Sequence, residues 1–143
     1  MNTSSLTPLR IGILNGDDMG HEIVPATVEI TRAAAALHGV AIEWSPLPIG
    51  RIALDTHGHT LPPATLDGWI LGPIGHRAHR RSDAVGPRDH THNRSNDGAL
   101  GMAASMSRAI TEALGDADAR TGDIRGRGAT RTITQAVLRS LRA

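Results

Sequence analysis

The stretch that most constrains the fold is residues 11–22, which reads I-G-I-L-N-G-D-D-M-G-H-E. A short apolar run leads into a turn rich in glycine and aspartate, and a segment with helical apolar spacing follows. This order is typical of a buried strand, a tight turn and a helix N-terminus. Because Pro25 is tolerated only near the first turn of a helix, the helix cannot begin much before His21. The pattern therefore predicts a strand near residues 9–14 and a helix near residues 21–37.

Two further apolar stretches and two further amphipathic stretches complete the predicted fold. Residues 40–45 alternate apolar and polar side chains, and residues 68–72 form another apolar run, so both predict strands. Helical spacing of apolar residues recurs near 99–114 and 132–142. Two parallel strands joined through a helix form a right-handed crossover. We therefore expect a single three-layer α/β domain over residues 1–143, built on a short parallel sheet.

Composition divides this domain into three parts. Residues 1–75 hold the predicted strand–helix–strand unit and the third strand, and residues 98–143 are mainly helical. Between them, residues 76–97 are rich in histidine and arginine and contain almost nothing apolar. Such a segment cannot bury enough surface to fold alone, so we expect a polar loop there.

Composition also narrows the classes of partner. The chain has no Phe, Tyr or Cys, so its core must be built from aliphatic side chains and two Trp, and we expect that self-association adds buried area. A formal charge of +1 and few aromatic groups argue against a nucleic-acid partner. No apolar run approaches membrane-spanning length and no secretory leader pattern is present, so we expect a cytoplasmic protein without a membrane partner.

The turn between the first strand and helix is one candidate ligand site. Glycines there can let a ligand approach the backbone, and a helix N-terminus attracts anions. A second glycine-rich loop follows the predicted third strand. The candidate cofactor-binding residues are Gly16, Gly20, Gly72 and Gly75. The simpler interpretation of the first turn is a helix cap in which an aspartate accepts hydrogen bonds from N-terminal amides.

A second set of candidates has the residue types of an acid–base site. Histidine titrates near neutral pH, and α/β proteins place their sites at the carboxyl ends of parallel strands. Loops expected at that edge carry one aspartate and several histidines, with Asp55 beside them. The candidate catalytic residues are Asp17, His21, His57 and His59.

The polar segment carries a third set of candidates. Paired histidines with carboxylates nearby suit Zn²⁺ or Ni²⁺, and here Asp83 and Asp89 supply the carboxylates. The candidate metal ligands are His76, His79, His90 and His92. The arginines of this segment could grip a carboxylate or phosphate through paired hydrogen bonds; they are Arg77, Arg80, Arg81 and Arg88. A solvated basic loop without a ligand is the alternative interpretation of all these residues.

The exact residues of the first turn are more specific than the general strand–turn–helix pattern. G-D-D-M-G-H-E-I-V-P-A resembles the opening motif G-D-G-I-G-x-E-[IV]-[VM] of the β-decarboxylating dehydrogenases, which include isocitrate, isopropylmalate, tartrate and homoisocitrate dehydrogenases. Residues 49–75 resemble the region that follows in the family, and residues 103–141 resemble its C-terminal stretch, with Arg120, Thr121 and Asp123 among the matching positions. The resemblance implies the fold of the isopropylmalate dehydrogenase lobe that contains both chain termini.

The resemblance does not extend to the central part of the family's sequences. It implies that relatives carry there an arginine cluster for the substrate carboxylates, a Tyr and a Lys as acid and base, aspartates that ligate Mg²⁺ or Mn²⁺, and an H-G-S-A-P-D-I-A-G loop for the dinucleotide. None of these motifs occurs in this sequence, which contains no Lys and no Tyr. We therefore expect a truncated relative that has lost the parental oxidative decarboxylation and acts as a binding or assembly module, with self-association through its helices.

Two other functions stay open. One is a small repurposed enzyme that uses His and Asp side chains, in acid–base or metal-assisted chemistry, on a small carboxylate. The other is a residual NAD-binding oxidoreductase, which keeps the nicotinamide side of the site through the Gly16 and Gly72–Gly75 loops. The candidate cofactors are accordingly NAD(P) or a divalent metal, and the candidate partners are a second copy of the chain and a small carboxylate or nucleotide.

Overall fold

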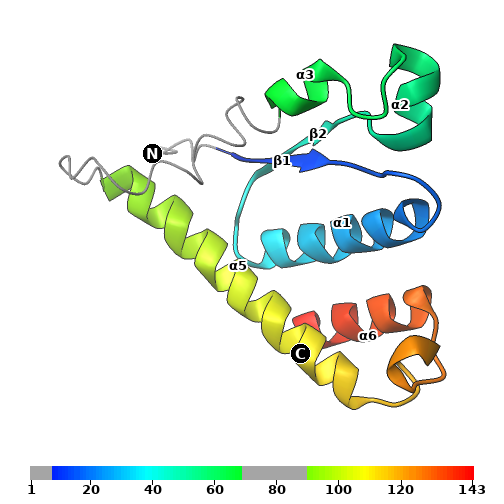
Figure 1. Cartoon of the computed structure of the whole chain (residues 1–143). Helices are drawn as coiled ribbons and strands as arrows, with labels where there is room; N and C mark the ends of the chain where they lie inside the picture. The colour runs from blue at the N-terminus through cyan, green and yellow to red at the C-terminus, as the bar shows by residue number, and fades with distance from the viewer. Residues whose placement is uncertain (1–7, 69–89) are drawn as a thin grey trace.

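The computed structural model describes residues 8–68 and 90–143, and for residues 90–96 the backbone alone. Figure 1 shows the arrangement of the elements in these ranges. In chain order they are β1 (Leu9–Ile13), α1 (Gly20–Leu37), β2 (Ile42–Pro46), α2 (Gly50–His57), α3 (Pro63–Leu66), α5 (His90–Gly115), the 3-10 helix η2 (Gly122–Ile124) and α6 (Thr130–Arg142).

The two described strands form a parallel sheet. Leu9 lies opposite Ile42 and Ile13 opposite Pro46, and α1 is the crossover that joins the strands. In Figure 1 the sheet lies between α1 on one side and α2 and α3 on the other. The predicted α/β architecture and its first two strands are therefore confirmed, with ends that differ by one or two residues. The third predicted strand, near residues 68–72, lies outside the described residues except for Gly68.

The core lies where α1, α5 and α6 meet. Most of its members are alanines, which let helix backbones approach closely, and Val40 and Ile42 pack against it from the sheet side. Its buried residues are Ala34, Ala35, Met102, Ala109, Ala113, Ala119, Ala136, Val137 and Leu141. A hydrogen bond of 2.8 Å between His38 Nε2 and Ser105 Oγ joins the end of α1 to α5. The small-residue core expected from the composition is thus assembled mainly by helices.

Helix α5 begins at His90, nine residues before the predicted start near residue 99. The polar loop predicted for residues 76–97 is therefore too long at its C-terminal end. Residues 90–97 have no apolar stripe that would indicate a helix. Extending an existing helix adds one hydrogen bond for each residue fixed, so a helix nucleated by the apolar residues after Gly98 can continue backwards through polar ones. Periodicity of apolar residues does not reveal such an extension.

None of the helices in the two described ranges combines the length and the apolar character that crossing a bilayer requires.

Candidate functional site

A groove opens at the carboxyl ends of the two parallel strands. Its volume is about 380 Å³, and it lies between the segments that follow β1 and β2 and one side of α2. The lining residues are Ile13, Asn15, Gly16, Pro46, Leu47, Pro48, Ile49, Ile52 and His57. Parallel α/β sheets place ligand sites at this edge, because the loops after successive strands diverge there. The groove is therefore the candidate functional site.

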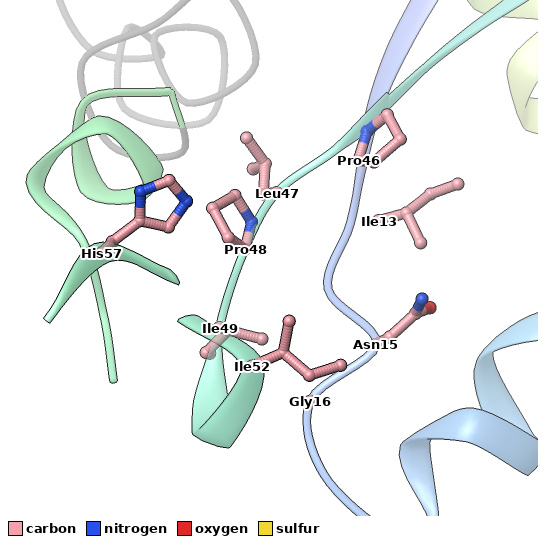
Figure 2. A pocket seen from close by; sticks show the side chains of 9 residues that line it. All are labelled: Ile13, Asn15, Gly16, Pro46, Leu47, Pro48, Ile49, Ile52 and His57. Atoms are coloured by element: carbon pink, nitrogen blue, oxygen red, sulfur yellow. The ribbon is translucent and has the colours of Figure 1, made fainter. Parts of the chain in front are cut away.

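The lining of the groove is mainly apolar. Figure 2 shows Asn15 and His57 on opposite sides of the groove, with aliphatic and proline side chains between them. Those two side chains are the polar ones in the lining. An amide can both donate and accept a hydrogen bond, and so can a neutral imidazole. The arrangement suits a ligand with an apolar body and polar groups at its two ends.

The carboxylate of Asp17 fixes the position of α2 beside the groove. Its Oδ1 accepts a hydrogen bond of 2.7 Å from the backbone N–H of Arg51, in the first turn of α2. The residue at the N-cap position of that helix, Ile49, has no side-chain acceptor. Gly50 adopts φ +77°, and a Cβ there would lie 2.6 Å from the Asp17 carboxylate. Asp17 therefore caps a helix that begins 33 residues later in the sequence.

The turn before α1 is held by a close approach between two backbone segments. Gly20 donates its N–H to the Asp17 carbonyl at 2.9 Å. A Cβ at Gly20 would overlap the Asn15 carbonyl oxygen, so only glycine fits at this position. The contact folds the chain back on itself directly after β1, which places Asn15 and Gly16 in the groove wall.

The structure separates the four predicted catalytic residues. His57, the last residue of α2, lines the groove, whereas Asp17 binds the other end of the same helix, about 10 Å away at 1.5 Å per residue. His21 and His59 are exposed and lie outside the lining. No hydrogen bond or ion pair joins any two of the four in the described structure. Their catalytic role stays a prediction, and the geometry assigns only His57 to the groove.

Among the predicted cofactor residues, Gly16 lines the groove and Gly20 packs against the backbone of Asn15. Gly72 and Gly75 lie outside the described residues. In the part of the chain that is described, no three His, Asp or Glu side chains gather in a way that could hold a metal ion. His76 and His79 lie outside the described residues, and for His90 and His92 only the backbone is described, in the first turn of α5. The metal site therefore stays a prediction.

Sequence reasoning missed most of the groove. Ile52 and the segment from Pro46 to Ile49 carry no chemistry that would mark them as functional. One signal was available, since the carboxyl ends of both strands were predicted and a site at that edge follows from the fold. The first turn of α2 is bonded to Asp17, and this contact leaves no local pattern in the sequence.

Replacement of Asp17 tests its capping role. Asp17→Ala removes the acceptor of the Arg51 N–H, and we expect a loss of about 1 kcal/mol in the free energy of unfolding and faster hydrogen exchange at the Arg51 amide. Asp17→Asn keeps an acceptor oxygen and should lose less than half of that. Asp18→Asn is the control, because the Asp18 ion pair with Arg51 spans 3.8 Å between exposed groups. Unchanged Arg51 exchange in Asp17→Ala would contradict the assignment.

Comparison with protein families gives a match to this chain. The sequence profile of a family described as isocitrate/isopropylmalate dehydrogenase matches residues 10–84, just over half of the 143 residues. The matched range contains β1 from Arg10 onward, α1, β2, α2 and α3, and with them every residue that lines the groove. No curated protein and no solved structure shows a significant match to the chain.

Proposed function

The chain belongs to the isocitrate/isopropylmalate dehydrogenase family, and we propose that it is a truncated member that binds a small ligand in the groove and has lost the oxidative decarboxylation. The observation that carries this proposal is the groove itself. It is a largely apolar site with two polar groups, at the sheet edge where α/β proteins bind ligands. A site of this composition can hold a ligand without offering groups for the parental chemistry.

The amino-acid composition supports the loss of the reaction. The resemblance to the family implies a Tyr and a Lys as acid and base, and this sequence contains neither. Proton transfer needs a group of matched pKa within hydrogen-bond reach of the substrate. Asn15 cannot take that role, which leaves His57 as the titratable side chain in the lining. A repurposed acid–base enzyme is the alternative function, and it would have to work with that histidine.

The groove also limits the class of ligand. Its volume of about 380 Å³ lies at the small end of the usual range for ligand pockets. Burial of an apolar ligand face against Ile13, Ile49 and Ile52 supplies about 25 cal/mol for each Å² removed from water. Asn15 and His57 can hydrogen-bond a carboxylate, a phosphate or the edge of a base. Small carboxylates and nucleotides, including the parts of NAD(P), are therefore the ligands to test.

A thermal-shift panel tests the proposal. The panel contains NAD(H), NADP(H), nucleotides, small di- and tricarboxylates and divalent metals. A ligand at a hundred times its dissociation constant stabilises by roughly 2.7 kcal/mol, which raises Tm by several degrees. We expect such a rise with at least one nucleotide or carboxylate, and we expect Ile52→Asp to abolish it because the charge removes the apolar wall.

Two histidines provide a matched comparison within the same panel. His57→Gln should weaken the ligand, whereas His59→Gln should not, because both residues are exposed but only His57 lines the groove. Equal shifts in wild type and Ile52→Asp would show that the ligand binds elsewhere and would overturn the binding proposal. Formation of NAD(P)H from isocitrate or isopropylmalate would overturn the loss of the reaction.

A further inference from the structure

The lining of the groove is poor in groups that hold multiply charged anions. Among the described residues it contains no arginine, and its polar side chains are the neutral amide of Asn15 and the imidazole of His57. Proteins usually hold phosphates and dicarboxylates with arginine forks, helix N-termini or free backbone amides. Helix N-termini and backbone amides do lie close to this edge of the sheet, so their existing hydrogen bonds decide whether such an anion can bind.

The groove wall that follows β2 offers no backbone N–H to a ligand. Pro46 and Pro48 have no N–H group, because their rings close on the backbone nitrogen. Between them, Leu47 donates its N–H to the Ile13 carbonyl at a distance of 2.8 Å. The Pro48 carbonyl accepts a hydrogen bond of 2.6 Å from the Thr65 hydroxyl. These three wall residues therefore give the groove hydrocarbon surface and no donor for an anion.

The first amides of both helices beside the groove already have acceptors. At the start of α2, the N–H of Gly50 donates to a backbone carbonyl and that of Arg51 to the Asp17 carboxylate, each at 2.7 Å. At the start of α1, Gly20 and His21 donate their N–H groups to carbonyls of the preceding turn, at 2.9 and 3.2 Å. A ligand could use these amides only by breaking bonds that hold the turn and α2 in place.

The Asn15 end of the groove has a negative surrounding charge. Asp17 and Asp18 follow closely in the chain, and the Arg51 guanidinium lies 3.8 Å from the Asp18 carboxylate. Two carboxylates and one guanidinium leave one net negative charge, which would repel a ligand carboxylate placed beside Asn15. His57 lies on the opposite side of the groove, at the far end of α2 (Figure 2). A single negative charge on a ligand is therefore tolerated best at the His57 end.

The apolar part of the lining is stiff and uncovered. The proline rings have no side-chain rotamers to lose, and the β-branched side chains of Ile13 and Ile49 are restricted at their first torsion. Ile52, in the first turn of α2, has 53% of its maximal accessible area exposed. A ligand with a compact hydrocarbon body can cover this surface without ordering flexible side chains first.

On the basis of the proposed ligand-binding function, we propose that the groove selects monocarboxylates with a branched hydrocarbon body and rejects dicarboxylates, tricarboxylates and phosphates. The single carboxylate accepts a hydrogen bond from the His57 ring, and the hydrocarbon body covers the apolar wall. The Asn15 amide then faces a neutral end of the ligand, such as a hydroxyl group. This selectivity is opposite to that of a site for isocitrate or isopropylmalate, which carry more than one carboxylate.

Two acids that differ by one carboxylate test the selectivity directly. 4-Methylpentanoate has the carbon skeleton of 2-isopropylsuccinate without one of its two carboxylates. We expect the monocarboxylate to bind with a dissociation constant about tenfold smaller or less, because the second charge would lose hydration without gaining a partner. Titration of the ¹⁵N-labelled chain with each acid, followed by NMR, measures both dissociation constants and locates the binding site. Inorganic phosphate is titrated in the same way, and we expect no binding in the groove.

Asp18→Asn tests the origin of the selectivity. The substitution removes one negative charge and releases Arg51 from its ion pair, and asparagine tolerates the backbone φ of +40° at this position. We expect 2-isopropylsuccinate to bind about threefold more tightly or better, whereas 4-methylpentanoate should bind as in wild type. Glu29→Gln is the matched control, because Glu29 is an exposed carboxylate in the middle of α1. An equal gain in both variants would overturn the role of the charge beside the groove.

The Ile52→Asp variant separates failure of the selectivity from failure of groove binding. If 2-isopropylsuccinate, phosphate or a nucleotide binds wild type more tightly than 4-methylpentanoate and Ile52→Asp abolishes that binding, the selectivity is overturned and the groove remains a ligand site. If 4-methylpentanoate binds Ile52→Asp as tightly as wild type, it binds elsewhere, and both the selectivity and the groove are overturned for this ligand. If neither acid binds, the monocarboxylate class is overturned, and the thermal-shift panel alone decides whether the groove binds another ligand.

Discussion

Gly20→Ala should destabilise the protein by about 3 kcal/mol or more, a large part of the 5–15 kcal/mol that holds a typical domain together. The Cβ of an alanine at this position would overlap the carbonyl oxygen of Asn15. That oxygen belongs to the backbone, so it cannot move aside as the end of a side chain can. The turn between β1 and α1 would have to open, which would displace Asn15 and Gly16 from the groove.

Urea unfolding followed by circular dichroism measures this effect. Gly115→Ala is the matched control, because nothing lies within 4 Å of a Cβ at Gly115 and its φ lies outside the left-handed region. We expect Gly115→Ala to change the free energy of unfolding by less than about 0.5 kcal/mol. Equal stabilities for the two variants would show that the turn does not have the close approach described above.

Ala34→Leu should cost about 2 to 3 kcal/mol, the second largest effect that we expect from a single substitution. Ala34 is fully buried in the cluster where α1 meets α5 and α6. Ala109 and Val137 belong to the same buried cluster, so added methylenes at Ala34 would have to displace packed atoms. The leucine would force the helices apart or adopt a strained rotamer.

Ala36→Leu provides the comparison within the same helix. Ala36 lies two residues further along α1 and is exposed, so leucine there should change stability by less than about 0.5 kcal/mol. Thermal unfolding of both variants measures the difference. A loss of stability in Ala36→Leu as large as in Ala34→Leu would contradict the three-helix core.

The helices and strands that depend on nearby residues were predictable from the sequence. The apolar run after Leu9 and the glycine–aspartate turn defined β1 and the start of α1, and Pro25 limited that start correctly to the region of Gly20. The second strand followed from the alternation of side chains over residues 40–45. In each case the residues that decide the structure lie within a few positions of one another.

The contacts that shape the groove were not predictable in this way. Asp17 caps α2 across 34 positions of sequence, and neither the turn nor the helix shows by itself that the two meet. Gly20 was interpreted as a position that lets a ligand approach, whereas it lets the backbone of Asn15 approach. His57 and His59 are indistinguishable by sequence, and only the course of α2 decides that His57 lines the groove.

The prediction of where α5 begins was wrong for a different reason. Sequence patterns detect helices by the apolar stripe that packs against a core, and residues 90–97 have none. The apolar residues after Gly98 predicted a helix, but the sequence did not show which of them are buried in the core. The structure divides these residues into a buried and an exposed set.

The most direct measurement is an NMR titration of the ¹⁵N-labelled chain with the best ligand from the thermal-shift panel, in a sample that is also assayed for NAD(P)H formation with isocitrate or isopropylmalate. We expect the largest chemical-shift changes at the amides of Gly16, Ile52 and His57, with no turnover of isocitrate or isopropylmalate. Chemical-shift changes centred away from the strand ends would contradict the claim that the chain binds its ligand in the groove. Turnover of either substrate would contradict the claim that it has lost the family's reaction.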